Sequence, residues 1–202
     1  MTPTRSFSLT WDYRCPFARN AHEHVLDALD AGAPWDVTFV PFFLDQVHAA
    51  EGSTPAWDDP EHLPNLVSLQ AGIVVRDQFP EQFLAVHRSL FTARHDEGHD
   101  LRDRAVVHDA LARGGVDADA VLAEVDKGWA ATVARTTYDD VVERLDVFGV
   151  PTFIVGDDAA FARIMTRPQG DGALARATID RVLDLLIDHP ELNELKHTRV
   201  SR

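Results

Sequence analysis

The chain has 202 residues, of which 45% are hydrophobic, and this is enough for a globular fold with a core of its own. Its 33 acidic residues against 19 lysines and arginines give a net charge of −14, which argues against surfaces that bind nucleic acid or anionic membranes. No apolar signal-peptide core follows the N-terminus, no window has the length of a membrane-spanning helix, and a single cysteine cannot form an internal disulfide. We therefore expect a soluble, cytoplasmic protein that acts on small molecules.

The first forty-odd residues predict a strand–helix–strand unit. Residues 6–12 alternate apolar and polar side chains, as a strand does. The apolar spacing from Phe17 to Leu29 predicts a helix, and Pro16 suits its first position because a missing N–H costs nothing there. Residues 35–44 are rich in aromatic and β-branched side chains and predict a second strand, parallel to the first.

A loop over residues 45–60 is followed by patterns typical of helices alone. The sequence Asp59-Pro60-Glu61 is expected to begin a helix, because it offers a capping acid, then proline, then an acid in the first turn. Apolar side chains at helical spacing then continue to Leu145. The expected helical stretches are 63–75, 79–91, 103–113, 117–125 and 129–145.

Strand patterns return after this helical block. Residues 149–155 predict a strand that is entered through Pro151, and residues 156–158 (Gly-Asp-Asp) predict a tight turn into a partner strand over 159–164. Residues 173–187 predict a strongly amphipathic final helix. The element order is therefore β-α-β, a helical block, and β-β-α, which indicates the α/β class.

Cys15, the only cysteine, stands where the first strand passes into the first helix. A helix N-terminus carries partial positive charge and free N–H groups, which stabilise a thiolate and lower its pKa. Arg14 adds positive charge beside it. A lone cysteine is commonly a small buried hydrophobic residue, but its place before Pro16 and Phe17 at this junction favours a nucleophile. We expect Cys15 to be at least partly exposed, with a lowered pKa.

Two motifs in this order resemble the DsbA-like branch of the thioredoxin superfamily: Cys-Pro-Phe-Ala at residues 15–18 and Gly-Val-Pro-Thr-Phe at 149–153. That branch also includes kappa-class glutathione transferases and 2-hydroxychromene-2-carboxylate isomerases. The resemblance implies a thioredoxin-like α/β fold with an all-helical insertion, in one domain over residues 1–202. The implied thioredoxin part covers residues 1–44 and 148–190, and the implied insertion covers about 60–147.

The resemblance also implies roles for residues. The Val150–Pro151 peptide bond would be cis and would pack against Cys15, and the backbone of Val150 would offer hydrogen bonds to a thiol substrate. Cys15 would be the catalytic residue, and no metal site is expected. The residues expected to bind the substrate or thiol are Trp11, Arg14, Pro16, Phe17, Val150 and Pro151.

Ala18 departs from the family pattern, because the redox-active members have a second cysteine at this position. A CxxA protein cannot resolve a mixed disulfide by itself, so we expect a monothiol oxidoreductase or thiol transferase with a low-molecular-weight thiol as co-substrate. The resemblance implies glutathione or mycothiol in this role, and no tightly bound cofactor. Acidic helices rich in Ala, Arg and Asp and the ending at residues 191–198 look like actinobacterial members, whose thiol would be mycothiol.

Two alternatives stay open from the sequence. One is a transferase or isomerase that uses a bound thiol cofactor, with Cys15 orienting the cofactor sulfur. The other is a non-catalytic binding module on a degenerate thioredoxin fold, which a buried Cys15 without a cleft beside Pro151 would favour. The expected partners are a small thiol or disulfide, with neither nucleic acid nor a membrane, and the sequence leaves open a homodimer.

Overall fold

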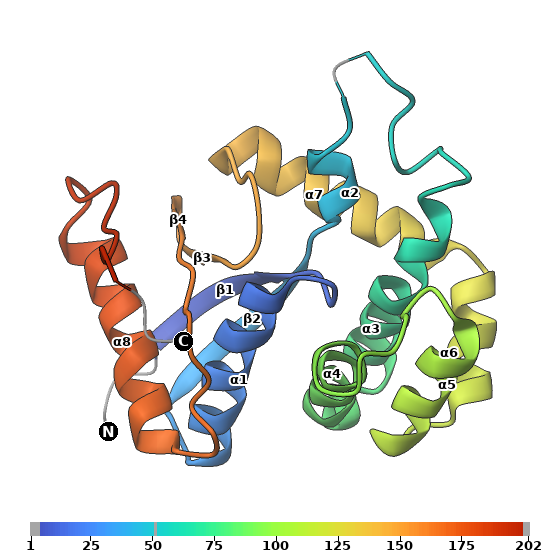
Figure 1. Cartoon of the computed structure of the whole chain (residues 1–202), viewed down its shortest axis with the longest axis horizontal. Helices are drawn as coiled ribbons and strands as arrows, with labels where there is room; N and C mark the ends of the chain where they lie inside the picture. The colour runs from blue at the N-terminus through green and yellow to red at the C-terminus, as the bar shows by residue number, and fades with distance from the viewer. Residues whose placement is uncertain (1–4, 51, 200–202) are drawn as a thin grey trace.

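The computed structural model describes residues 5–50 and 52–199. Its centre is a four-stranded sheet with the strand order β2-β1-β3-β4 (Figure 1). The first two strands pair in parallel and β3 pairs antiparallel with β4, as the sequence patterns predicted. In addition, β3 pairs antiparallel with β1. The strands are β1 (Arg5–Trp11), β2 (Trp35–Pro41), β3 (Thr152–Val155) and β4 (Asp158–Phe161).

The sheet buries one row of large side chains at its centre. Leu9 of β1 is paired with Phe39 of β2 on one side and with Phe153 of β3 on the other. Leu9 and Phe153 are completely buried, and Phe39 is nearly so. Burial of three such side chains contributes on the order of 2 kcal/mol each, so this row anchors the register of the strands that carry the two motifs.

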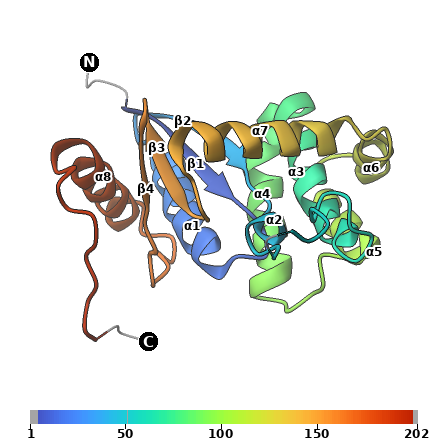
Figure 2. The same ribbon diagram turned by 90° about the horizontal axis from the view of Figure 1, so that it is seen from above.

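Two helices of the thioredoxin part pack against each other, α1 (Pro16–Asp30) and α8 (Gly172–Asp188). They approach closely where α8 begins, because a Cβ atom on Gly172 would lie 2.4 Å from the Cβ of Ala31. Helix α7 (Trp129–Leu145) lies on the other side of the strands from α1 (Figure 2). The sheet is therefore covered on both faces.

The insertion forms a group of helices beside the sheet (Figure 1). Between α4 (Pro80–His95) and α5 (Arg104–Arg113) lies another close approach, since a Cβ on Gly114 at the end of α5 would lie 2.6 Å from the Cα of Val86 in α4. The helices between β2 and α7 are α2 (Leu44–Val47), a short 3-10 helix (Leu63–Leu66), α3 (Val67–Gln78), α4 (Pro80–His95), α5 (Arg104–Arg113) and α6 (Ala118–Asp126).

The helix expected to begin at Asp59-Pro60-Glu61 is absent, and this prediction is wrong. The Asp59 side chain does accept a hydrogen bond from the Glu61 N–H, but the chain makes only a turn there, which runs into the short 3-10 helix at Leu63. Pro64 follows within a turn and has no N–H with which to continue a helix. The regular helix starts only at Val67.

A helix that spans a bilayer needs about 20 mostly apolar residues. No helix between residues 5 and 199 is long and apolar enough to cross a bilayer.

Candidate active site

Cys15 is the N-cap residue of α1, as predicted. Its backbone is extended, with φ −86° and ψ 118°, and its Sγ accepts a hydrogen bond from the Ala18 N–H at 3.4 Å. Pro16 takes the first position of the helix. The sulfur therefore accepts a hydrogen bond from one of the N–H groups at the start of α1 that have no partner within the helix.

The second motif lies directly against this sulfur. The Val150–Pro151 peptide bond is cis, which confirms the expectation. The Cys15 thiol donates a hydrogen bond to the carbonyl oxygen of Val150 at 3.4 Å. On its other side the loop is held by β4, because the Ala162 N–H donates to the Pro151 carbonyl at 3.2 Å. Two stretches that are far apart in sequence thus form one site around Cys15.

Thr10 holds the loop around Pro151 in place through its hydroxyl group, a role that was not predicted from the sequence. Its hydroxyl oxygen accepts a hydrogen bond from the Thr152 N–H at 2.8 Å. The Thr152 hydroxyl in turn donates to the Gly149 carbonyl at 2.7 Å. Both threonines are buried, so these bonds satisfy polar backbone groups where the proline loop enters β3.

The exposure and pKa expected for Cys15 are both wrong. Only 8% of its surface is exposed. Burial raises the pKa of the thiol above its ordinary value, and the negative charge of Asp12 acts in the same direction. The N–H groups of Ala18 and Phe17 and the charge of Arg163 lower the pKa, but by less. The thiol also donates to Val150, and such a bond favours the protonated form.

Arg14 does not act as a free positive charge beside the sulfur. Its guanidinium lies between the carboxylates of Asp12 and Asp45, at 3.4 Å from Asp12 and 2.5 Å from Asp45. Burial disfavours ionisation of Asp45, but hydrogen bonds from Arg14, His62 and Asn65 outweigh it and lower the pKa of this carboxyl. Arg14 thus ties α2, which follows β2, to the segment just before Cys15.

The remaining residues expected to bind a substrate are only partly brought together. Pro16 is exposed and Phe17 half-buried at the start of α1, next to Cys15. Val150 and Pro151 are buried, and Val150 contacts Cys15 through its backbone carbonyl. Trp11 is completely buried, so the structure places it in the core and not on a binding surface.

An aromatic surface that the sequence did not reveal lies beside the proline loop. Phe148 is 65% exposed and packs against Phe161, with 5.2 Å between the ring centroids. Arg163 lies over the rings of both Phe161 and Phe17, at 5.6 and 5.4 Å from their centroids. We call these four residues the arginine–aromatic ledge.

A chain of buried polar groups runs behind Cys15 through the core, and we call it the histidine chain. His22 donates through Nε2 to the Thr10 carbonyl at 3.0 Å, so its Nδ1 accepts from His87 Nε2 at 2.9 Å. His87 Nδ1 then accepts from the Tyr13 hydroxyl at 2.8 Å. Burial lowers the pKa of His22 to about 4 and that of His87 well below 6.5, so both imidazoles are neutral at pH 7.

An ion cluster joins α1 to two distant segments. Arg19 and Glu23, both nearly buried on α1, pair at 3.4 Å. Arg19 also pairs with Asp96, and Arg167 pairs with Glu23 and with Asp96, the latter at 3.1 Å. These charges satisfy one another, and so the arginines among them are not free to bind a ligand.

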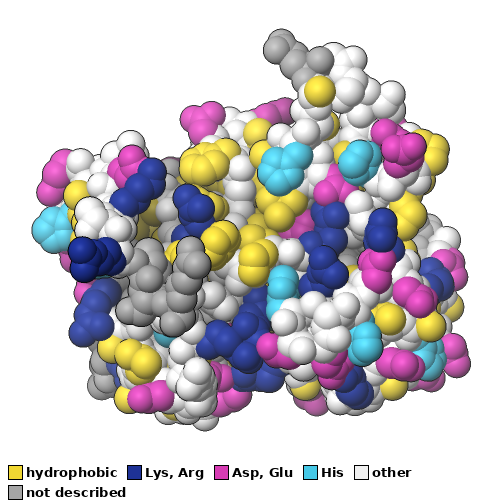
Figure 3. Space-filling model, viewed as in Figure 1, with side chains coloured by type: hydrophobic (Ala, Val, Ile, Leu, Met, Phe, Trp, Pro, Cys, Tyr) yellow, Lys and Arg dark blue, Asp and Glu magenta, His cyan; other side chains and the backbone are white. Residues whose placement is uncertain are grey.

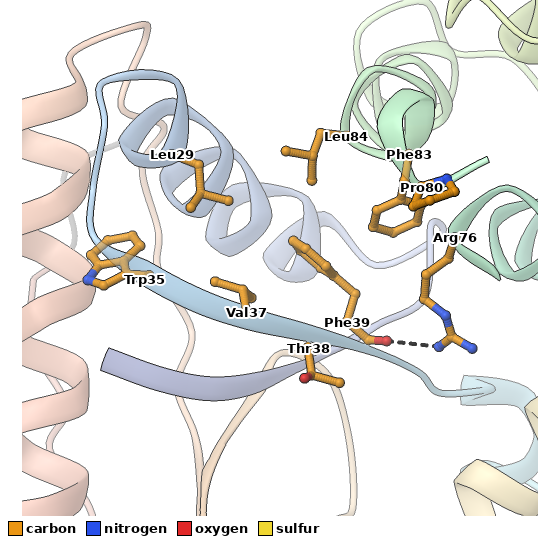
Figure 4. A pocket seen from close by; sticks show the side chains of 9 residues that line it. All are labelled: Leu29, Trp35, Val37, Thr38, Phe39, Arg76, Pro80, Phe83 and Leu84. Atoms are coloured by element: carbon orange, nitrogen blue, oxygen red, sulfur yellow. Dashed lines mark hydrogen bonds between the residues drawn. The ribbon is translucent and has the colours of Figure 1, made fainter. Parts of the chain in front are cut away.

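One pocket lies away from Cys15. It has a volume of about 440 Å³ between β2, α1 and the insertion, and apolar side chains line most of it (Figure 4). Arg76 closes one end by donating to the Phe39 carbonyl at 2.9 Å. None of the predicted site residues lines this pocket. No cluster of three or more metal-binding side chains occurs within residues 5–50 and 52–199.

Comparison with known proteins locates this arrangement in a family. Residues 9–166 match the family model of the DSBA-like thioredoxin domain. A comparison with curated protein sequences gave no match.

Solved structures of low identity share the fold. DsbA of Pseudomonas aeruginosa is 21% identical with a TM-score of 0.55, and 91% of this chain aligns with 86% of that one. BdbD of Bacillus subtilis is 16% identical with a TM-score of 0.57, over 89% and 87% of the two chains. MdbA of Actinomyces oris, a thiol-disulfide oxidoreductase, is 17% identical with a TM-score of 0.59, over 86% and 81%. The thioredoxin-like fold with a helical insertion is therefore confirmed, while an actinobacterial origin stays a prediction.

Proposed function

The chain belongs to the family of DSBA-like thioredoxin domains, and on that premise we propose that it is a thiol–disulfide oxidoreductase with Cys15 as its single reactive sulfur. The observation that carries the proposal is the contact between this sulfur, at the start of α1, and the carbonyl of Val150 in the cis-proline loop. Ala18 stands one helical turn further on and offers no second thiol. The catalytic cycle therefore needs a thiol from outside the protein.

The proposed chemistry has two exchange steps. The Cys15 thiolate attacks one sulfur of a small disulfide, RSSR′, so that a Cys15–S–SR bond forms, the S–S bond breaks, and R′S⁻ leaves. A second low-molecular-weight thiolate then attacks the sulfur of R, which forms a new small disulfide and returns the Cys15 thiolate. The electrons balance because the two steps only exchange thiolates.

The thiol rests in its protonated form at neutral pH. Burial raises its pKa, and its proton lies on the bond to the Val150 carbonyl. When the proton leaves, this bond is lost, while the N–H group of Ala18 still faces the sulfur and stabilises the thiolate. The structure therefore supports an enzyme whose rate rises with pH through the titration of Cys15.

Glutathione and mycothiol are the co-substrates that we propose, in the cytoplasm, where they are reduced. A net charge of −14 and the burial of Cys15 favour a small partner over a nucleic acid or a membrane. No tightly bound cofactor is needed for the exchange.

A second candidate function follows from the raised pKa. A neutral thiol is a hydrogen-bond donor, so Cys15 would orient the sulfur of a bound thiol cofactor without forming a bond to it. The protein would then catalyse a conjugation or isomerisation at the cofactor sulfur. In that mechanism a serine hydroxyl would replace the thiol with little loss.

Two substitutions distinguish these functions. We expect wild-type protein, mixed with glutathione disulfide or mycothiol disulfide, to form one adduct on Cys15 in intact mass spectra and to reduce 2-hydroxyethyl disulfide with the matching thiol. Cys15→Ser should abolish both. Ala18→Cys should convert the adduct into an internal disulfide and release the small thiol.

Other outcomes point elsewhere. Activity that persists in Cys15→Ser would favour the cofactor-orienting function. Absence of both adduct and activity, with either thiol, would favour the non-catalytic binding module and contradict the oxidoreductase.

A further inference from the structure

Arg163 is positioned beside Cys15 by contacts on both sides. Its guanidinium lies over Phe17, in the first turn of α1, and over Phe161, at the end of β4. The segment that carries it is fixed to α1, since the Asn20 side chain donates to the Ile164 carbonyl at 3.0 Å. The same segment is fixed to the proline loop through Ala162. Arg163 therefore has a defined place on the rim of the site.

Arg163 also differs from the other arginines around Cys15 in having no acidic partner. Arg14 is held by two aspartates, and Arg19 and Arg167 belong to the ion cluster with Glu23. Within residues 5–50 and 52–199, Arg163 makes no ion pair, and its side chain is exposed. In a chain with a net charge of −14, a free guanidinium at this point is available to an anion.

The rest of the arginine–aromatic ledge is apolar: Phe148 is exposed, and Phe17 and Phe161 are half-buried. Phe148 is 65% exposed and lies against Phe161, so the two rings form a contiguous apolar surface beside Arg163. A Cβ atom on Gly149 would lie 3.5 Å from Phe161, so the loop approaches this ring closely. Hydrophobic side chains gather on this face over the start of α1 and the end of α7, with basic side chains among them (Figure 3).

On the basis of the proposed function, we propose that the arginine–aromatic ledge selects disulfide substrates that carry a carboxylate beside an apolar body. Arg163 would pair with the carboxylate, which matches the planar fork of a guanidinium. Phe148 and Phe161 would contact the apolar part of the ligand. Arg163 is then a specificity-determining residue, and it takes no part in the bonds that form and break.

The test compares two aromatic disulfides of similar size. One is 5,5′-dithiobis(2-nitrobenzoate), which carries two carboxylates, and the other is the neutral 2,2′-dithiodipyridine. With each, the Cys15 thiolate forms a mixed disulfide and releases one coloured aromatic thiolate or thione. The ratio of the two rates is the readout, because a change in the pKa of Cys15 alters both rates equally and cancels.

We expect Arg163→Met to lower this ratio by about threefold to tenfold, as one unit charge at this range predicts, and Arg163→Lys to retain most of it. Arg181→Met is the matched control, since Arg181 is exposed on α8 and forms no ion pair in the described chain. It changes the net charge equally and should keep the ratio of the wild type. An unchanged ratio in Arg163→Met, or an equal fall in Arg181→Met, overturns the proposal.

A binding measurement separates this proposal from the oxidoreductase function. S-methylglutathione carries two carboxylates and cannot exchange, so its binding to Cys15→Ser protein is followed by calorimetry. We expect binding that the added Arg163→Met substitution weakens at least threefold. If neither disulfide reacts with the wild type, the oxidoreductase function is rejected, and the calorimetric measurement alone tests the role of the ledge. Weaker binding in the Arg163→Met protein supports that role, and absent or unaltered binding refutes it.

Discussion

Acidification from about pH 7 to about pH 5 is expected to destabilise the fold by about 4 kcal/mol through the histidine chain. His22 and His87 are completely buried, and burial lowers the pKa of both. In the unfolded chain each imidazole has a pKa of about 6.5. At pH 5 the unfolded state therefore binds nearly two more protons than the folded state.

The size of the effect follows from this difference. Each histidine lowers the free energy of unfolding by about 1.4 kcal/mol for every pH unit below 6.5, so each lowers it by about 2 kcal/mol at pH 5. The direction follows from the lowered pKa of both histidines in the folded protein. Their contribution to stability is complete above about pH 6.5, where the imidazoles are neutral in both states. It is lost as the pH falls toward the folded pKa, which for His22 is about 4. Acid thus acts on the core directly.

Urea unfolding at half-unit steps between about pH 5 and pH 7.5 measures the slope of stability against pH. His87→Gln is expected to reduce this slope by about one proton, or about 1.4 kcal/mol per pH unit. The slope is independent of the constant loss that the substitution causes at every pH, when Tyr13 and His22 lose a partner. His24 and His95, whose pKa values burial also lowers, contribute equally to both proteins and cancel.

The control is His197→Gln, because this side chain is exposed in the C-terminal segment before and after unfolding. It should leave the slope unchanged. A wild-type stability that is flat between about pH 5 and pH 7, or the same slope in His87→Gln, would refute the assignment of two neutral imidazoles.

Two further predictions concern the site and the core around it. Iodoacetamide should label Cys15 with a midpoint above about pH 8.5, the value of a free thiol, because burial raises the pKa, and a lower midpoint by mass spectrometry would contradict this. Gly72→Ala should destabilise the fold by about 1–3 kcal/mol in urea unfolding, because the new Cβ would lie 2.5 Å from the Tyr13 hydroxyl, whereas wild-type stability would show that Tyr13 moves freely.

The start of α1 could be predicted because it depends on local chemistry. Pro16 is compatible with a first helical position and with few others, so Cys15 before it is the N-cap. The cis Val150–Pro151 bond followed from the resemblance and not from the residues alone. The parallel pair β1–β2 and the β3–β4 hairpin followed from the sequence patterns, whereas the place of β3 beside β1 did not.

The burial of Cys15 could not be predicted, because it depends on segments distant in sequence. The helix N-terminus favours a thiolate, as the sequence suggested. However, Val150 covers the sulfur, and the resulting loss of solvation outweighs the N–H groups. Arg14 likewise appeared free in the sequence, whereas folding brings Asp45 against it. These effects depend on distances that no local pattern contains.

The histidine chain was missed although a signal for it was present. His22 and His87 both occupy apolar positions in the helical stripes of their segments. A polar side chain in such a position is buried and needs a partner. Two of them on separate helices were a reason to expect that they meet. The identity of the partner still depended on how the insertion packs against α1.

Helix α1 has little freedom to accept substitutions, because almost every direction around it is already occupied. His22 faces the insertion, Glu23 faces Arg167, and Asn20 holds the segment after β4. Asp27 receives both Arg88 and the Gly170 N–H near the other end. Evolution of a new specificity in this protein would therefore proceed through the segments that meet α1, while the helix itself stays nearly fixed as their common template.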